Sequence, residues 1–358
     1  MIKTDICDLL GIKYPIVQAP MGPFNTQELA VAVTNAGGFG MVSHPVPDPE
    51  YGIVSVAADT SRQIEVMKNI KDKFIGSLKY VAEKANGFFG VNLRVSPIQY
   101  DVPVLIDSLL KERENNPDLK EKLKLIITSA GDPGQRMFKK FVKAGLMRFH
   151  TVPSLYHAKK AEQAGVDGIV ITGYEAGGHV AREPYQTFVI VPEVVKSVNV
   201  PVLGGGGVCD GKGLVAMLAF GAQGIYMGTR FIATKECEFH DNVKQEIINS
   251  SEKFKKETPS IVTQGVYGPL RHLKNKFSLE LFELTKKLKN KEITIEDVWK
   301  YESDHTYEAK GDGDVENGAI WAGQVSMRLH EIPTCKELIE SIMKEAEETL
   351  KNLSVYCK

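Results

Sequence analysis

A histidine closes a run of small residues in the segment ITGYEAGGHV, which spans residues 171–180. Near neutral pH an imidazole can accept a proton, donate one or hold an anion, and the glycines beside His179 would let a flat cofactor and a small substrate come close. Glu175 precedes these two glycines and could orient the loop by accepting hydrogen bonds from backbone N–H groups, or act as a second acid or base. The segment therefore predicts a site for acid–base chemistry, with both roles of Glu175 open.

Glycines also end two apolar runs further along the chain. Four consecutive glycines, 204–207, end the run VPVLGGGG, while Gly228 and Thr229 lie in GIYMGTRF. Consecutive glycines let backbone N–H groups gather around an anion with no Cβ in the way. The DGKG that follows, residues 210–213, is expected to start a helix whose amino end also favours negative charge. These features predict a phosphate-binding site.

Eight short apolar runs alternate with stretches of helical periodicity, the pattern of a parallel sheet with crossover helices. The eight runs lie at residues 14–19, 39–43, 87–95, 123–130, 146–152, 168–173, 200–205 and 224–231. Eight strands close a (β/α)8 or TIM barrel, whose ligand sites form at the carboxyl ends of the strands and whose phosphate sites follow strands seven and eight. The histidine loop and both glycine segments follow such strand ends.

The predicted fold class is thus α/β, a TIM barrel with a small C-terminal helical subdomain. Helices are expected at residues 26–38, 133–145, 154–165, 192–198 and 210–221, with a long excursion at 45–86 before the third strand. Three parts are expected along the chain: the main barrel at 1–234, a helical subdomain at 235–310 interrupted at 255–269, and a return loop with a C-terminal helix packing on the barrel at 311–358.

The amino-acid composition limits the classes of partner that the protein is expected to bind. The chain has 358 residues, 44 Lys and Arg against 45 Asp and Glu, and a net charge of −1, so charge gives no reason to expect nucleic acid or an anionic membrane as partner. Its five cysteines and eight histidines lack metal-ligand spacing, so no metal site is expected. With scattered thiols and no run near the ~18 apolar residues of a membrane span, we expect a cytoplasmic protein with a small-molecule partner.

Taken together, the motifs resemble those of the nitronate monooxygenase family, formerly called 2-nitropropane dioxygenases. The motifs that carry this resemblance are QAPM at 18–21, AVTNAGGFG at 32–40, FGVN at 89–92, GYEAGGH at 173–179, the glycines at 204–207, MGTRF at 227–231 and AGQ at 322–324. The order and spacing of the motifs before AGQ cover about residues 10–232, and AGQ extends the likeness toward the end of the chain. The flavin-dependent enoyl-acyl-carrier-protein reductases of fatty-acid synthesis are similar in the same places, so the resemblance determines the fold and FMN better than the substrate.

The resemblance implies a role for individual residues. His179 would be the catalytic base or proton donor near the flavin N5. Met21 and Asn92 match residues that contact the flavin ring, and Thr151 falls where many relatives place a cofactor-contacting side chain. The phosphate would be held by the glycine-rich loops after strands seven and eight. The full set implied to contact FMN is Ala19, Pro20, Met21, Asn92, Thr151, Gly178, Gly206, Gly207, Gly228 and Thr229.

The implied activity is oxidation of an alkyl nitronate by FMN and O2 to a carbonyl compound and nitrite. The alternative is an enoyl-acyl-carrier-protein reductase that takes hydride from NAD(P)H and reduces an enoyl thioester. The chain departs from many nitronate monooxygenases after the histidine, where it has Val180-Ala181-Arg182-Glu183 in place of an arginine or proline followed by glycine. This departure leaves the substrate open between the two.

Two other classes stay open from the sequence. One is a flavin carrier that binds FMN without turnover, which would have no need of a histidine at the mouth of the barrel. The other is a phosphosugar isomerase barrel, which would bind no flavin. The C-terminal helix could cover the pocket or make a homodimer contact.

Overall fold

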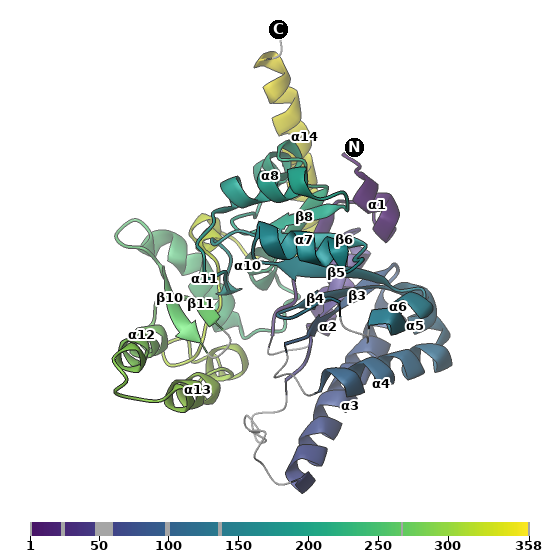
Figure 1. Ribbon diagram of the computed structural model, residues 1–358. Helices are drawn as coiled ribbons and strands as arrows, with labels where there is room; N and C mark the ends of the chain where they lie inside the picture. The colour runs from purple at the N-terminus through teal and green to yellow at the C-terminus, as the bar shows by residue number, and fades with distance from the viewer. Residues whose placement is uncertain are drawn as a thin grey trace.

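The computed structural model describes residues 2–22, 26–46, 60–96, 101–134, 138–265 and 268–356, and Figure 1 shows their arrangement. Eight parallel strands form one sheet in the order β1-β9-β8-β6-β5-β4-β3-β2, which confirms the eight predicted strands. They are β1 Ile16–Gln18, β2 Gly40–Val42, β3 Phe89–Arg94, β4 Leu123–Ser129, β5 Met147–Val152, β6 Gly168–Thr172, β8 Val202–Gly205 and β9 Gly224–Met227. The last strand is shorter than expected, because the short helix α10 (Thr229–Ile232) begins there.

The sheet closes into a barrel where β1 meets β2. Backbone pairing there is limited to an isolated parallel bridge between Val17 and Phe39. The side-chain amide of Gln18 completes the seam: it donates to the carbonyl of Met41 and accepts from the Met41 N–H, both at 3.1 Å. A buried amide with both ends paired in this way replaces missing strand-to-strand hydrogen bonds.

Apolar side chains fill the barrel interior, so the barrel is a packed core rather than a channel. Helix α1 (Asp5–Leu10) adds its buried side chains to this cluster. The Thr4 hydroxyl just before α1 donates to the carbonyl of Gln223, which precedes β9, so α1 covers the amino ends of the strands. The opposite end, where the strands finish, is left for a ligand. The interior cluster contains Val17, Phe39, Met41, Leu125, Ile127, Phe149, Val170, Leu203 and Tyr226.

Helices cover the outside of the barrel. The expected helices are present as α2 (Gln27–Asn35), α6 (Phe138–Lys143), α7 (Leu155–Gln163), α8 (Thr187–Ser197) and α9 (Gly211–Ala219), although residues 135–137 lie outside the described residues. The excursion before β3 contains a 25-residue helix, α3 (Thr60–Lys84), and residues 47–59 of it lie outside the described residues. Two helices not expected from the sequence, α4 (Val102–Asn115) and α5 (Pro117–Lys122), follow β3.

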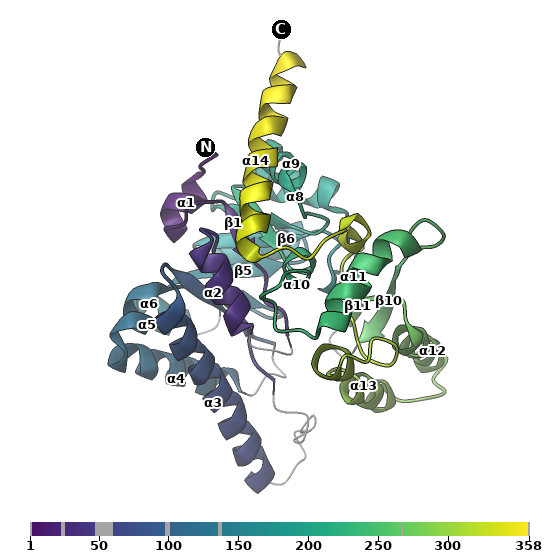
Figure 2. The same cartoon turned by 180° about the vertical axis from the view of Figure 1, so that it is seen from behind.

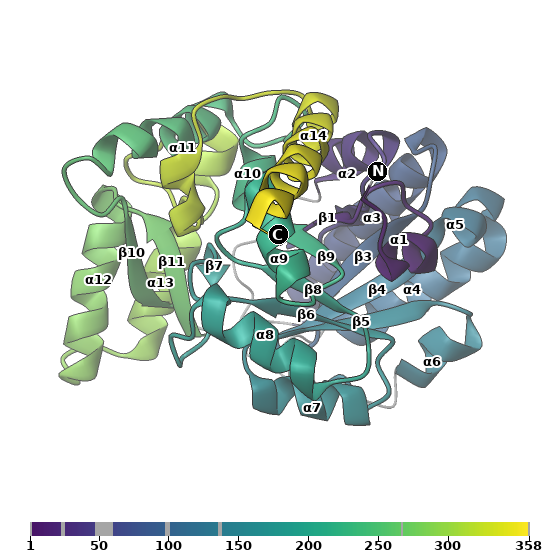
Figure 3. The same cartoon turned by 90° about the horizontal axis from the view of Figure 1, so that it is seen from above.

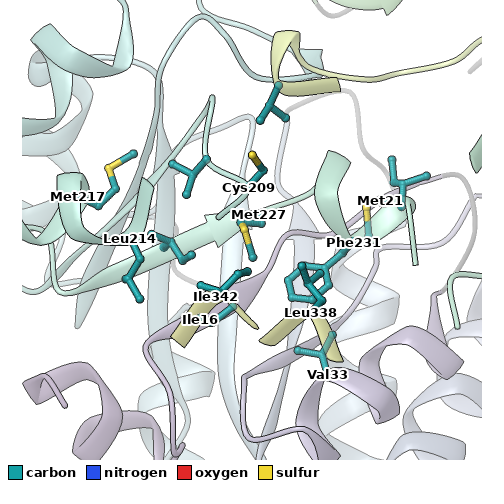
Figure 4. Close-up of a cluster of buried hydrophobic side chains, with 14 of the residues drawn as sticks. Ile16, Met21, Val33, Cys209, Leu214, Met217, Met227, Phe231, Leu338 and Ile342 are labelled. Atoms are coloured by element: carbon teal, nitrogen blue, oxygen red, sulfur yellow. The ribbon is translucent and has the colours of Figure 1, made fainter. Parts of the chain in front are cut away.

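The C-terminal helix α14 (Cys335–Leu353) packs along the barrel beside α9 and α2. Figure 2 shows its last turns projecting beyond the body, and Figure 3 shows α14 from above, beside α9. Figure 4 shows part of the large apolar cluster at this contact, where Leu338 and Ile342 of α14 join Leu214 of α9 and Val33 of α2. Among the described parts of the chain, no helix is both long and apolar enough to cross a membrane.

Residues 235–312, here called the lobe, lie to one side of the barrel in Figure 1. The lobe contains the expected helices. The segment 255–269, which is expected only to interrupt them, instead begins an antiparallel pair of strands. β11 also pairs with β7 (Gly178–His179), so the lobe is joined to the histidine loop by backbone hydrogen bonds. The lobe consists of α11 Asp241–Lys253, β10 Ser260–Gly265, β11 Gly268–Leu273, α12 Lys276–Lys289, α13 Ile295–Asp304 and a π-helix Glu308–Asp312.

Candidate active site

The loop after β8 has the backbone that an anion site needs. Gly206 and Gly207 have φ angles of 89° and 74°, in the left-handed region that favours glycine. A Cβ at Gly206 would lie 2.8 Å from the backbone nitrogen of Gly173, so a larger residue would push the two loops apart. No described residue accepts a hydrogen bond from the N–H of Gly206 or Gly207. These N–H groups can therefore point at a bound anion.

The turn after β9 lies beside this loop, because β8 and β9 are neighbours in the sheet. Gly228 precedes α10, and the nearest atom to a Cβ placed there would be that of Ala19, at 3.6 Å. The Sδ of Met21 would lie 3.9 Å away. The structure thus brings Gly228 together with the segment that follows β1, as a shared binding surface requires. The Met21 side chain is 7 % exposed and packs in the apolar cluster of Figure 4.

Polar side chains lie at the carboxyl ends of the strands, on the inward-facing positions. Asn92 on β3 is buried, and its Nδ2 donates to the carbonyl of Ile127 at 3.0 Å, which fixes the amide in place. Thr151 on β5 forms a hydrogen bond with the hydroxyl of Tyr226, whose pKa is raised by burial and lowered slightly by that bond. Arg94, two residues after Asn92, faces the same side and donates from Nη2 to the carbonyl of Pro45 at 3.3 Å.

His179 lies on β7, where its partner in the register is Leu270 of β11. The N–H of Val180 donates to the carbonyl of Pro269 at 3.0 Å and extends this pairing. Solvent reaches the ring, but the surrounding protein disfavours its charged form and lowers the pKa of His179 to about 4, with a further contribution from the positive charge of Arg94. The imidazole is therefore neutral at pH 7, and can donate one hydrogen bond and accept another. Gly178 beside it has a φ of 71° and open space where a Cβ would lie.

Glu175 performs the first of its two expected roles. Its carboxylate accepts from the N–H of Thr187 at 3.0 and 3.1 Å and from the Thr187 hydroxyl at 2.8 Å, at the start of α8. Its own carbonyl accepts from the N–H of Gln324 at 2.9 Å, and the N–H of Gly323 donates to Thr229 Oγ1 at 2.9 Å. Residues 322–324 therefore tie the histidine loop to the turn after β9.

We expect Glu175→Ala to lower the free energy of unfolding by about 1–2 kcal/mol, because the first N–H of α8 would lose its acceptor, while the Thr187 hydroxyl would still donate to the carbonyl of Gly206 at 2.9 Å. Glu183→Ala is a matched control, because Glu183 is exposed and its side chain has no partner among the described residues; that change should stay within about 0.5 kcal/mol. Urea denaturation of both variants measures the difference. Equal stability of the two variants would show that the carboxylate does not hold the loop.

The expectation that the amino end of α9 attracts a ligand anion is wrong. Asp210 accepts from the N–H of Gly213 at 2.8 Å, and Glu345 of α14 accepts from the N–H of Gly211 at 2.7 Å. Arg328 also pairs with Asp210. Two carboxylates already satisfy the helix end, and their charge would repel an anion. The loops after β8 and β9 remain as the predicted phosphate-binding segments.

Sequence reasoning missed three groups at this end of the barrel. Arg94 could have been found from its spacing, because it shares a strand face with Asn92. His44 belongs to no motif in the sequence, but it is buried with Asp101 (2.9 Å between Nε2 and Oδ2) and accepts from the Arg94 N–H at 3.0 Å. Lys310 of the lobe reaches the carbonyl of Gly22, and no local sequence signal marks that contact.

Comparison with known proteins assigns the chain to a family. A family model described as nitronate monooxygenase matches residues 3–345, and the chain belongs to that family. It is 29 % identical to a probable nitronate monooxygenase of Staphylococcus saprophyticus, with 98 % of this chain and 99 % of the relative covered. It is 28 % identical to a (3aS,4S,5R,7aS)-5-hydroxy-7a-methyl-1-oxo-octahydro-1H-indene-4-carboxyl-CoA dehydrogenase of Rhodococcus jostii, with 96 % of each covered.

Solved structures agree with this assignment. FabK from Thermotoga maritima has a TM-score of 0.80 and 29 % identity over 99 % of this chain and all of that one. A nitroalkane oxidase from Streptomyces ansochromogenes has a TM-score of 0.73 over 97 % of this chain and all of that one, and at 23 % identity it supports the fold alone. The protein is thus an oxidoreductase of the nitronate monooxygenase family with a TIM-barrel fold.

Proposed function

We propose that the protein is an FMN-dependent nitronate monooxygenase that uses O2 to convert alkyl nitronates to a carbonyl compound and nitrite. The observation that carries this proposal is the neutral imidazole of His179, held at the same barrel mouth as two glycine loops whose N–H groups have no described acceptor. Family membership supports the proposed reaction class, and this geometry supports the proposed residues.

The residues at the mouth fit FMN. Gly206, Gly207, Gly228 and Thr229 would hold the phosphate, because the first two offer unpaired N–H groups and a Cβ at Gly228 would meet nothing closer than 3.6 Å. When bound, FMN supplies the transfer of electrons between the nitronate and O2. The groups that would contact the rest of the cofactor are Ala19, Pro20, Met21, Asn92, Thr151 and Gly178.

His179 favours a nitronate over a neutral nitroalkane. Taking a proton from the carbon of a nitroalkane is strongly uphill for a base whose conjugate acid has a pKa of about 4. Donating a hydrogen bond to the oxygen of an anion needs no such proton transfer, and the charge of Arg94, which is felt at His179, favours an anion there. His179 would thus bind and orient the nitronate.

The proposed activity is tested by rapid mixing without oxygen. The purified protein loaded with FMN is mixed separately with propionate 3-nitronate, NADH and NADPH, and flavin absorbance is followed. We expect the nitronate to bleach the flavin within the mixing experiment, and to release nitrite once O2 is admitted, while the nicotinamides react far more slowly. Rapid bleaching by NAD(P)H, reversed by an enoyl thioester, would instead support the reductase alternative. A protein that retains no flavin would contradict both.

A further inference from the structure

Lys310 extends from the lobe to the rim of the barrel. It lies in the π-helix Glu308–Asp312, and its Nζ donates to the carbonyl of Gly22, the residue after the QAPM segment, at 3.4 Å. The same Nζ lies 3.3 Å from the centroid of the Trp321 ring. A π-helix is an uncommon, strained turn that is often found at functional sites. The amine is therefore placed where the lobe meets the mouth of the barrel.

The surroundings of Lys310 satisfy it only in part, through one hydrogen bond and through the rings of Trp321 and Phe239, whose centroids lie 3.3 and 5.7 Å from Nζ. The residue is 2 % exposed, and within the described ranges the Gly22 carbonyl is the one hydrogen-bond acceptor for its three donors. Burial lowers the pKa of Lys310 well below its usual value, and the charge of Glu302 raises it only in part. Lys244, the other lysine that is buried among the described residues, is different: it pairs with Asp241 at 3.0 Å and donates to the carbonyl of Lys235 at 3.3 Å. A buried amine with one long hydrogen bond costs stability that a bound acceptor would offset.

A second buried group in the same region has no hydrogen-bond partner among the described residues. His272 is fully buried, and neither ring nitrogen has a hydrogen bond to any residue in the described parts of the chain. Burial lowers the pKa of His272 to about 3, and Lys310 and His179 both lower it further, so all three groups lie within electrostatic range of one another. His272 is two residues past Leu270, the register partner of His179. Unpaired buried polar groups that gather at one mouth mark the place of a polar ligand.

We propose that Lys310 is a substrate-binding residue, which donates a hydrogen bond from the lobe to a negatively charged or strongly polarised oxygen of the substrate. This inference rests on the proposed function, in which that oxygen belongs to a nitronate. The carbonyl oxygen of a thioester shares the same chemistry. A buried amine with one hydrogen bond lowers the stability of the protein. Its role in substrate binding explains why this amine is nevertheless present beside Trp321.

The test compares Lys310→Met with Lys244→Met, both in the FMN-loaded protein. For Lys310→Met we expect an unchanged flavin content, a melting temperature equal to or above that of the wild type, and a KM for ethyl nitronate raised about tenfold or more by the loss of a hydrogen bond to a charged group. Lys310→Gln, which keeps a donor, should recover part of the affinity. Lys244→Met should leave the KM unchanged.

A second readout needs no turnover. Crotonyl-CoA is titrated into the oxidised protein without NAD(P)H, and the shift in flavin absorbance gives a Kd. If Lys310→Met weakens the Kd for crotonyl-CoA and leaves the KM for ethyl nitronate unchanged, Lys310 binds a thioester carbonyl. In that outcome the proposed nitronate activity fails while the inference about Lys310 stands. The inference is overturned if the KM and the Kd both match the wild type, if the wild type responds to neither probe, or if Lys310→Met melts at a lower temperature with unchanged binding.

Discussion

His179→Ala is expected to lower kcat/KM for a nitronate about 100-fold or more, the usual loss when a preorganised donor or general acid–base group is removed. FMN content and melting temperature should not change, because the side chain is exposed and β7 pairs with β11 through backbone groups. Nitrite release measures the activity, and flavin absorbance after gel filtration measures the cofactor.

His330→Ala is the matched control for this variant, because His330 is also exposed and its side chain makes no hydrogen bond or ion pair with a described residue. It should retain wild-type activity. His179→Gln, which keeps one hydrogen-bond donor, should be less impaired than His179→Ala if the ring orients an anion, and equally impaired if it transfers a proton. A fully active His179→Ala enzyme would remove the histidine from the mechanism.

The pH profile provides an independent check on the state of the ring. Because the folded pKa of His179 is lowered from 6.5 to about 4, the neutral ring persists as the pH falls through 6.5 and is lost only near pH 4. The profile of kcat/KM reports groups of the free enzyme, so it should lack an inflection near 6.5 and fall only toward about pH 4. An inflection at pH 6.5 that disappears in His179→Gln would show that the His179 ring is solvated and keeps its ordinary pKa.

The barrel could be predicted because its strands are short apolar runs, each followed by a glycine or a polar turn. The long helix α3 was missed because its apolar residues, at 66, 70, 74, 78 and 81, recur between many charged ones and read as an excursion. The hairpin of β10 and β11 was missed for a different reason. β11 contains a buried arginine and histidine, a composition that a strand tolerates only because of its neighbours.

In the site, too, residues next to strand ends could be predicted from the sequence, whereas contacts between distant parts of the chain could not. His179 and the glycine loops are adjacent to strand ends, so counting strands was enough to place them. Lys310 and Gly22 are 288 residues apart, and no pattern near either residue indicates that contact. The error at α9 arose because a helix end that is free in the sequence is satisfied in the fold by Glu345, from the far end of the chain.

The lobe has a direct part in positioning the histidine loop. Arg271 of β11 is buried, and its Nη2 donates to the carbonyl of Tyr174 at 2.9 Å while Nη1 donates to Ser260 Oγ at 3.1 Å. The loop is thus held by Arg271 and the β7–β11 pairing from the lobe, and by Gly323 and Gln324 from the return segment. Because the lobe positions both His179 and Lys310, the two proposed substrate-binding groups would depend on the same contact between lobe and barrel.

The phosphate cradle can be tested with a single methyl group. Gly228 has a φ of −107°, so alanine there adds no backbone strain, and its Cβ would make only ordinary contact with Ala19 at 3.6 Å. We therefore expect Gly228→Ala to leave the apoprotein as stable as the wild type. The methyl group would occupy space at the proposed phosphate site and weaken FMN binding about tenfold or more, equivalent to about 1.4 kcal/mol. Gly228→Val should weaken it further.

Quenching of flavin fluorescence during titration of the apoprotein with FMN gives the Kd, and thermal unfolding without FMN gives the stability of each variant. Gly76→Ala in α3 is the control, since a Cβ there has open space around it and alanine favours a helix. It should bind FMN as the wild type does. If Gly228→Val binds FMN with wild-type affinity, the turn after β9 does not hold the cofactor, and the glycines at 206–207 would have to bind the phosphate without it.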